Sequence, residues 1–132
     1  MVTKSNDVNF LHNKEVKIGY RIVKIKVSSA NFNKNHMCEE YGQYIERTST
    51  MDLQDSLNVR DEVNTFIHEL LHAIVTDIGE TRKGAALDDE DVEERFVLTQ
   101  ANALTAMLFD NKWLVQYPVS YTHLRAHETV LD

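Results

Sequence analysis

The sequence predicts a small α+β domain in which a mostly antiparallel sheet packs on a core of two to three helices. Residues 56–78 and 88–110 carry apolar side chains at helical spacing, and residues 15–28 alternate between apolar and polar in the manner of a strand. One proline and four glycines are spread over 132 residues, so no flexible linker divides the chain. We therefore expect residues 1–117 to form a single domain.

The first strand is expected at residues 15–28. The apolar positions of its first half are Val16, Ile18, Tyr20 and Ile22. The apolar positions of its second half are Val23, Ile25 and Val27. The two sets are out of phase by one residue, and a period of two with one such change is typical of a strand with a β-bulge, here near Ile22 and Val23.

Residues 29–40 are rich in Asn and Ser and are expected to form a loop. Four potential metal ligands lie within it: His36, Cys38, Glu39 and Glu40. Their spacing matches no common zinc pattern, so we interpret the segment as a solvated loop. Two short strands are expected next, at 43–47 and 50–53, with Gly42 in a turn before them.

The segment 56–78 is expected to be a long helix. Its apolar stripe consists of Val63, Phe66, Ile67, Leu70, Leu71, Ile74, Val75 and Ile78. Ser56 or Asn58 can cap its start, and Gly79 suits the position just after its end. Because the helix is apolar around much of its circumference, we expect it to be central and buried.

A second helix is expected at 88–110, after a polar loop at 80–87. Acidic residues occupy its first turn, where the helix dipole favours negative charge. Its apolar stripe consists of Val97, Ala101, Leu104 and Leu108. The apolar side chains of residues 113–117 are expected to dock on the domain after this helix ends.

Charge and apolar content restrict the partners and the location. A net charge of −7 argues against nucleic acid, which requires clustered Lys and Arg. Four N-terminal lysines alternate with apolar residues and are expected on a solvated strand face: Lys14, Lys17, Lys24 and Lys26. No apolar run reaches the length of a membrane span. The single cysteine, Cys38, and the absence of a signal-like N-terminal segment make the cytoplasm the expected location.

The segment His68-Glu69-Leu70-Leu71-His72 matches the HExxH pattern of zinc hydrolases. In a helix, His68 and His72 lie one turn apart on one face and can bind the same metal ion. Glu69 lies about 100° around the helix, where its carboxylate can act on a water that the metal activates. Both histidines fall in the helix expected to be buried, where an unpartnered imidazole is costly and a metal ion is one possible partner.

A catalytic zinc requires a third protein ligand and an open position for water. A histidine ten residues after the first is excluded, because that position is Ile78. The second helix offers three acids near its start: Glu90, Glu93 and Glu94. On a helical wheel Glu93 and Glu94 flank the apolar stripe by about 50° on either side, so spacing alone leaves the choice open.

Three segments of the chain resemble small zincin-like proteins of phages and prophages. The segments are residues 65–74 around the HExxH pattern, residues 93–97 and residues 108–111. The chain is similar in these segments to the minimal gluzincins of the ImmA/IrrE-type and SprT-like peptidases. The resemblance implies a short sheet beside a zincin-like helical core, with the HExxH helix central and Zn2+ between two helices.

The same resemblance implies a role for each site residue. His68, His72 and Glu94 are then the zinc ligands, with Glu93 as the rival of Glu94, and Glu69 is the catalytic general base. The implied activity is hydrolysis of peptide bonds in a peptide or protein substrate.

A peptidase of this kind also needs a surface that holds the substrate. The strand at 50–53 is expected at the sheet edge, where an extended peptide could pair with it. Tyr41, Tyr44 or Tyr117 could stabilise the oxyanion. The alternative is a non-catalytic, zinc-stabilised phage or prophage protein that acts by protein–protein interaction, with the acidic residues 88–94 as its docking surface.

Residues 118–132 resemble a translated sequencing-adaptor artefact that recurs at the ends of predicted proteins. The segment begins Pro118-Val119-Ser120-Tyr121 and contains His123 and His127 at helical spacing. We interpret it as a non-native tail, expect it to be disordered and assign it no metal site.

Overall fold

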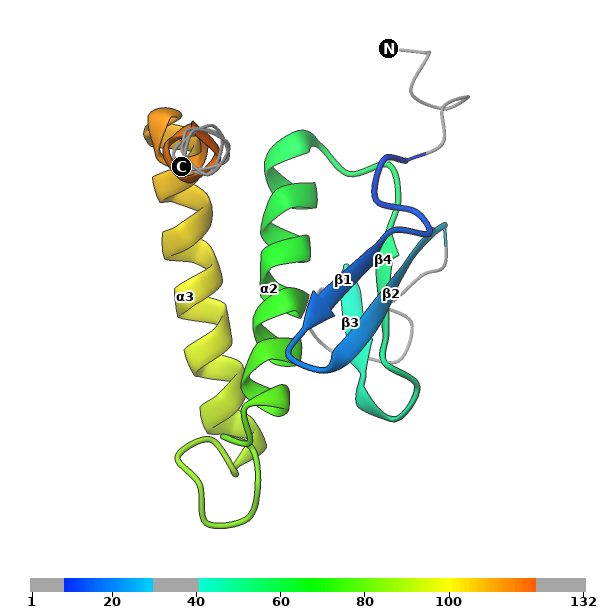
Figure 1. Cartoon of the computed structure of the whole chain (residues 1–132), viewed down its shortest axis with the longest axis vertical. Coiled ribbons are helices and arrows are strands. Elements are labelled where there is room, and N and C mark those ends of the chain that lie inside the picture. The colour runs from blue at the N-terminus through cyan, green and yellow to red at the C-terminus, as the bar shows by residue number, and fades with distance from the viewer. Residues whose placement is uncertain (1–8, 30–40, 121–132) are drawn as a thin grey trace, which may run out of the picture.

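A computed structural model describes residues 9–29 and 41–120, and it confirms the predicted α+β class (Figure 1). Helix α2 (Val59–Asp77) lies between a four-stranded sheet on one side and helix α3 (Glu90–Asp110) on the other (Figure 1). The strands are β1 (Glu15–Ile18), β2 (Arg21–Ser28), β3 (Gly42–Ile45) and β4 (Thr50–Gln54). The helices are the 3-10 turn η1 (Glu46–Thr48), α2 (Val59–Asp77) and α3 (Glu90–Asp110), and residues 113–120 are also helical.

The sheet has the strand order β1-β2-β4-β3. Strands β1 and β2 are antiparallel, as are β3 and β4, whereas β2 and β4 are parallel. Strand β4 is therefore interior, and the prediction that residues 50–53 form an edge strand is wrong. The reason is the burial of Met51 and Leu53, which are 0% and 3% exposed and join the apolar side chains of β2 in the core.

Residues 15–28 form two strands and not the single bulged strand that their pattern predicts. A two-residue turn begins at Gly19, whose φ is +62°, and a hairpin turn of this length favours Gly at its first position. Because the chain reverses there, Val16 pairs with Val23 and both face the core. The change of phase marks a hairpin, and Ile22 lies on the outer face of the sheet, 55% exposed.

The core lies between the sheet and α2. Its fully enclosed cluster consists of Val23, Ile25, Met51, Leu53 and Ala73. Helix α2 begins after Asn58, whose side chain accepts a hydrogen bond from the Asp61 amide at 2.8 Å. It ends before Gly79, whose φ of +87° suits the residue that follows a helix. The prediction of a central HExxH helix is confirmed.

Helix α3 is capped by the side chain of Asp89, which accepts hydrogen bonds from two amides of the first turn at 2.8 and 3.2 Å. Its buried residues are Val97, Ala101 and Thr105. The predicted stripe is therefore right at its first two positions. Leu104 and Leu108 are only partly buried, because Thr105 and not Leu104 turns fully toward α2.

The residues after α3 differ from what the sequence predicts. Trp113, Val115 and Tyr117 do not dock on the core and are 61%, 51% and 64% exposed, because their helix follows the far end of α3 and lies away from the sheet (Figure 1). Residues 118–120 continue that helix, in contrast to the expected disorder. The loop residues 30–40, with their four potential ligands, and residues 121–132 lie outside the described residues. Within the described ranges, no helix has the length and apolar composition that crossing a membrane requires.

Candidate metal centre

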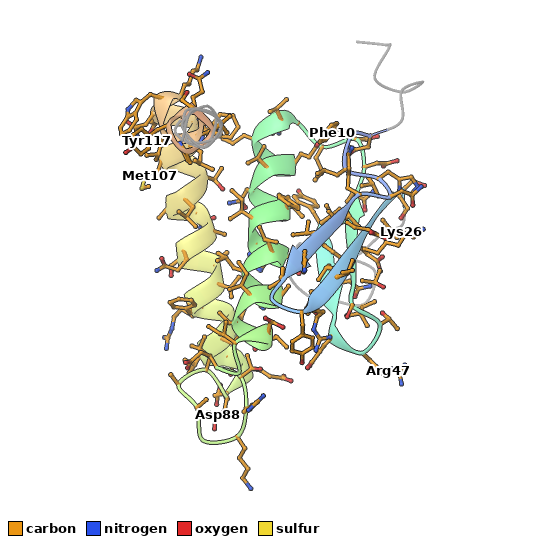
Figure 2. All side chains as sticks on the ribbon, viewed as in Figure 1. Phe10, Lys26, Arg47, Asp88, Met107 and Tyr117 are labelled. Atoms are coloured by element: carbon orange, nitrogen blue, oxygen red, sulfur yellow. The ribbon has the colours of Figure 1, made fainter. Side chains whose placement is uncertain are left out.

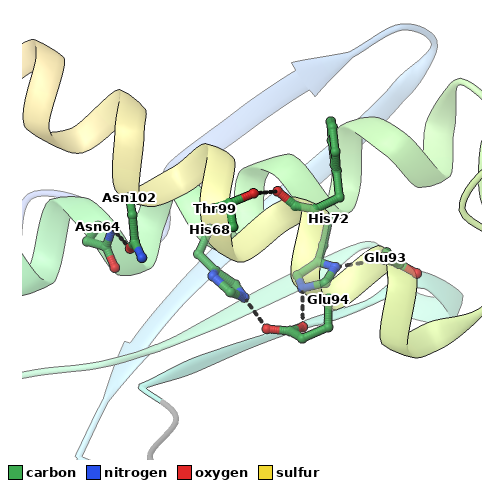
Figure 3. Close-up of polar contacts among 8 residues, drawn as sticks. Asn64, His68, His72, Glu93, Glu94, Thr99 and Asn102 are labelled. Atoms are coloured by element: carbon green, nitrogen blue, oxygen red, sulfur yellow. Dashed lines mark hydrogen bonds and ion pairs between the residues drawn. The ribbon is translucent and has the colours of Figure 1, made fainter.

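Helix α2 presents His68 and His72 toward the start of α3 (Figure 3). The centroids of their rings are 5.0 Å apart, and the ring planes differ by 61°. Both side chains are largely buried, at 16% and 17% exposure. The HExxH spacing thus brings the two imidazoles together on one face of the helix.

The carboxylate of Glu94 lies between the two imidazoles. Its Oε2 is 3.0 Å from Nε2 of His68, and its Oε1 is 3.0 Å from Nε2 of His72 (Figure 3). One ligand atom from each of the three residues lies within 4.8 Å of the others. Of the three acids that spacing could not separate, Glu94 is the one that reaches both histidines, and Glu90 is an exposed residue outside the cluster.

Glu93 contacts the other nitrogen of the same ring. Its Oε2 lies 2.7 Å from Nδ1 of His72, and its side chain is 18% exposed. A carboxylate on the far nitrogen of a metal-binding histidine fixes the ring orientation and the tautomer. The two acids treated as alternatives therefore contact His72 from two directions, because neighbouring helical residues diverge by about 100°.

The two acids determine the charge of His72. Burial of the ring lowers its pKa, but hydrogen bonds to Glu94 and Glu93 and the charge of Glu69 outweigh burial and raise the pKa to about 9. Hydrogen bonds from His68 and His72 lower the pKa of Glu94 to about 2, against burial, which raises it. In the metal-free protein His72 and Glu94 therefore form an ion pair near neutral pH, and a divalent cation would take the place of the hydrogen-bonded protons between Glu94 and the two imidazoles.

The donor set fits a zinc ion. Tetrahedral zinc with bonds of about 2.0–2.1 Å holds neighbouring ligand atoms about 3.3–3.4 Å apart. The 3.0 Å distances from Nε2 of His68 to Oε2 of Glu94 and from Nε2 of His72 to Oε1 are within a few tenths of an ångström of that separation, and one ligand atom from each residue lies within 4.8 Å of the others, so small side-chain movements would close the set around an ion. Two imidazoles and one carboxylate form a known ligand set of catalytic zinc. The side chain of Glu94 is 55% exposed, so the cluster is open to solvent on one side.

Glu69 follows His68 in α2 and is buried, with 6% exposure. Its charge contributes to the raised pKa of His72, so it acts electrostatically on the cluster. The edge strand β3 lies against α2 close to Glu69. A Cβ placed on Gly42 of β3 would come within 3.0 Å of Cγ2 of Thr65, and Thr65 is one helical turn before Glu69. Glu69 therefore lies on the part of α2 that is between the histidines and the edge strand.

The three tyrosines considered for the oxyanion lie in different places. Tyr117 lies past the far end of α3 from Glu94 (Figure 2), and the intervening helix is about 24 Å long, so it is excluded. Tyr44 packs against the core, and burial raises the pKa of its phenol, which lies beside Arg21. Tyr41 directly precedes β3 and is the one that its position in the fold still allows.

Sequence reasoning overlooked one polar residue in the same row of α2. Asn64 lies four residues before His68, so Asn64, His68 and His72 occupy three successive turns. Its side chain bonds to Asn102 and Thr105 of α3. The spacing of the sequence could have identified Asn64. It lies in line with His68 and His72 on a mostly apolar helix, where a polar side chain needs a partner.

Comparison of the chain with protein-family models, with curated proteins and with solved structures finds no match. The resemblance to zincin-like proteins therefore stays a prediction. Any function has to be argued from the site, since a small α+β fold is compatible with many activities.

Proposed function

We propose that this protein is a zinc-dependent metallopeptidase that hydrolyses peptide bonds. The observation that carries the proposal is the convergence of His68, His72 and Glu94, in which one carboxylate lies 3.0 Å from the Nε2 atoms of both rings. Two unrelated core histidines would not require a shared carboxylate from a second helix. Within the described residues the group offers three protein donors, which is the number that leaves a coordination position for water.

Each side chain of the cluster has a distinct role in this proposal. A zinc ion would supply a Lewis acid that lowers the pKa of a water molecule and polarises the scissile carbonyl. His68, His72 and Glu94 would hold the ion, and Glu93 would keep the ring of His72 oriented. Glu69 would accept the proton of the attacking water and deliver it to the leaving amine nitrogen as the C–N bond breaks.

The edge strand β3 is suited to holding an extended substrate. Among the described residues it pairs with β4 alone, so its other edge offers main-chain donors and acceptors. A peptide can add to such an edge through main-chain hydrogen bonds. Strand β3 thus takes the role that the sequence pattern assigned to residues 50–53, and it lies against α2 close to Glu69.

Glu69→Gln tests the proposal because it separates catalysis from metal binding. The variant should retain about one zinc per chain and lose hydrolysis of dye-labelled casein by at least about a hundredfold. Glu90→Gln makes the same charge change at an exposed position outside the cluster and should remain active. Equal rates for wild type and Glu69→Gln would contradict the mechanism.

A second candidate is a zinc-stabilised protein that acts by binding another protein. It is favoured by large apolar side chains exposed along α3 and the helix after it: Phe96, Leu98, Met107, Trp113 and Tyr117. Exposed apolar surface of this kind is one mark of an interaction site. This candidate predicts that wild type and Glu69→Gln bind zinc equally and that both are inactive on peptides.

A further inference from the structure

The side chain of Asn64 links α2 to α3 beside the metal cluster. Its Nδ2 lies 3.0 Å from Oγ1 of Thr105, 3.2 Å from Oδ1 of Asn102 and 3.4 Å from the carbonyl oxygen of Ala101. All three are acceptors, so the amide nitrogen of Asn64 is directed at α3 and its oxygen is directed away.

The neighbouring groups fix this orientation. Thr105 is 4% exposed and donates its own hydroxyl hydrogen to the carbonyl of Ala101 at 2.7 Å, so toward Asn64 it acts as an acceptor. Asn102 accepts from Asn64 through Oδ1, which leaves its Nδ2 as a donor. In the part of the chain that the structure describes, neither Oδ1 of Asn64 nor Nδ2 of Asn102 has a hydrogen-bond partner.

These two atoms lie on the same side of the helix pair as the metal cluster. Asn64 is one turn from His68 on α2, and Asn102 is two turns from Glu94 on α3. Figure 3 shows the Asn64–Asn102 pair on the side of His68 that faces away from Glu94. Asn102 is exposed, and so is Leu98, which lies between Asn102 and Glu94 on α3, at 45%. This side of α2 and α3 is thus accessible from Glu94 to Asn102.

An acceptor next to a donor is the complement of one residue of an extended peptide. The N–H and C=O of a residue in an extended strand point to the same side, so one residue can bond to both atoms. Four residues of α2 span about 6 Å, which corresponds to about two residues of an extended chain.

We propose that Asn64 and Asn102 form a main-chain subsite that binds the substrate residue about two positions from the scissile bond. The proposal rests on the proposed peptidase function and adds a substrate class to it, an extended polypeptide recognised through its backbone. Oδ1 of Asn64 accepts the N–H of that residue, and Nδ2 of Asn102 donates to its C=O. If the Asn64–Asn102 pair only joined the two helices, Nδ2 of Asn64 and Oδ1 of Asn102 would be sufficient, and the other two amide atoms would have no role.

Asn102→Asp distinguishes the two roles. The aspartate keeps an oxygen that accepts the hydrogen bond from Asn64, but it replaces the outward donor with an acceptor. Gln100→Glu is the matched control, because it makes the same amide-to-acid change at an exposed position on another face of α3. Both variants keep the buried contacts of Thr105 and should fold.

The test compares two inhibitors of the zinc-loaded protein by calorimetric titration. Acetohydroxamate occupies the metal alone, whereas acetyl-trialanine hydroxamate extends past it. In Asn102→Asp the Kd of the trialanine compound should rise about tenfold, while that of acetohydroxamate stays unchanged. Gln100→Glu should change neither value. The side-chain amide resonances of Asn102 should shift with the trialanine compound alone.

Each other outcome has a definite meaning. An unchanged ratio of the two Kd values in Asn102→Asp, with no shift of the Asn102 amide resonances, would overturn the subsite while leaving the metal site intact. Wild-type protein that binds neither hydroxamate would instead overturn the proposed function, and the subsite with it.

Discussion

The Nδ1 atom of His72 lies 2.7 Å from Oε2 of Glu93, while Nε2 of the same ring lies 3.0 Å from Oε1 of Glu94. Two adjacent carboxylates of α3 thus contact both nitrogens of one imidazole. Glu93 gives Nδ1 an acceptor, and this fixes the tautomer whose Nε2 lone pair can bind a cation.

Removal of the Glu93 carboxylate should therefore weaken metal binding without removing a ligand. We expect Glu93→Ala to lower zinc affinity about ten- to a hundredfold, measured by competition with a chelator. Glu93→Gln keeps an acceptor oxygen and should recover part of the loss. Glu90→Ala removes an exposed acid from the same helical turn and is the control. An equal loss in Glu93→Ala and Glu90→Ala would mean that net charge, and not the contact with His72, is responsible.

Zinc should raise the stability of the folded protein through the same cluster. A ligand that binds the native state alone contributes about 2.7 kcal/mol at a hundred times its Kd. The melting temperature of the wild type should increase with zinc concentration, because the unfolded chain does not bring α2 and α3 together. His72→Ala should show no increase, and an increase as large as that of the wild type would place the zinc outside this cluster.

The pH dependence of stability in the metal-free protein follows from the two perturbed groups. The pKa of His72 is raised from 6.5 to about 9, so its contribution is complete below pH 6.5 and is lost as the pH rises through 9. The pKa of Glu94 is lowered from 4.5 to about 2, so its contribution is complete above pH 4.5 and is lost as the pH falls through 2. Both contributions are complete between pH 4.5 and 6.5.

Urea unfolding of chelator-treated protein measures this dependence. The free energy of unfolding should decline between pH 6.5 and 9 in the wild type, and this decline should be smaller in His72→Ala. An alkaline decline of the same size in both proteins would show that His72 does not cause it.

Replacing Gly19, in the hairpin turn between β1 and β2, by alanine should destabilise the protein more than replacing Gly84. A Cβ on Gly19 would lie 2.5 Å from Oδ2 of Asp77 at the end of α2, whereas a Cβ on Gly84 would meet nothing within 4 Å. Both residues have positive φ, at +62° and +89°. Gly84→Ala should cost about 1 kcal/mol from backbone strain, and Gly19→Ala about 1–3 kcal/mol more, because Asp77 must move. Equal losses in urea unfolding would contradict the close approach of the turn to α2.

Local periodicity was sufficient to predict the two helices but not the course of the first strand. In α2 the apolar spacing and Gly79 place the end of the helix within one residue, whereas the helix begins three residues later than predicted because Asn58 and not Ser56 caps it. A two-residue turn at Gly19 shifts the alternation by one position, as a bulge does, so the pattern of residues 15–28 fits both. Strand order depends on pairing between distant segments, and spacing within a segment carries no information about it.

In the candidate site, too, the sequence predicts what lies within one helix but not how two helices meet. The placement of His68 and His72 follows from helical geometry alone. The positions of Glu93 and Glu94 depend on how α3 is rotated about its axis relative to α2, which is set by contacts such as Val97 and Ala101 in the interface. A rotation of α3 by about 100° would bring Glu93 to the position that Glu94 occupies, and no local pattern specifies that rotation.

The zinc content of protein purified without added metal tests the metal centre most directly, with wild type and His72→Ala analysed side by side by elemental analysis. The wild type should contain about one zinc per chain and His72→Ala much less, because the two remaining donors cannot hold the ion tightly. Wild-type protein without zinc, or equal zinc in both proteins, would contradict a metal centre at His68, His72 and Glu94.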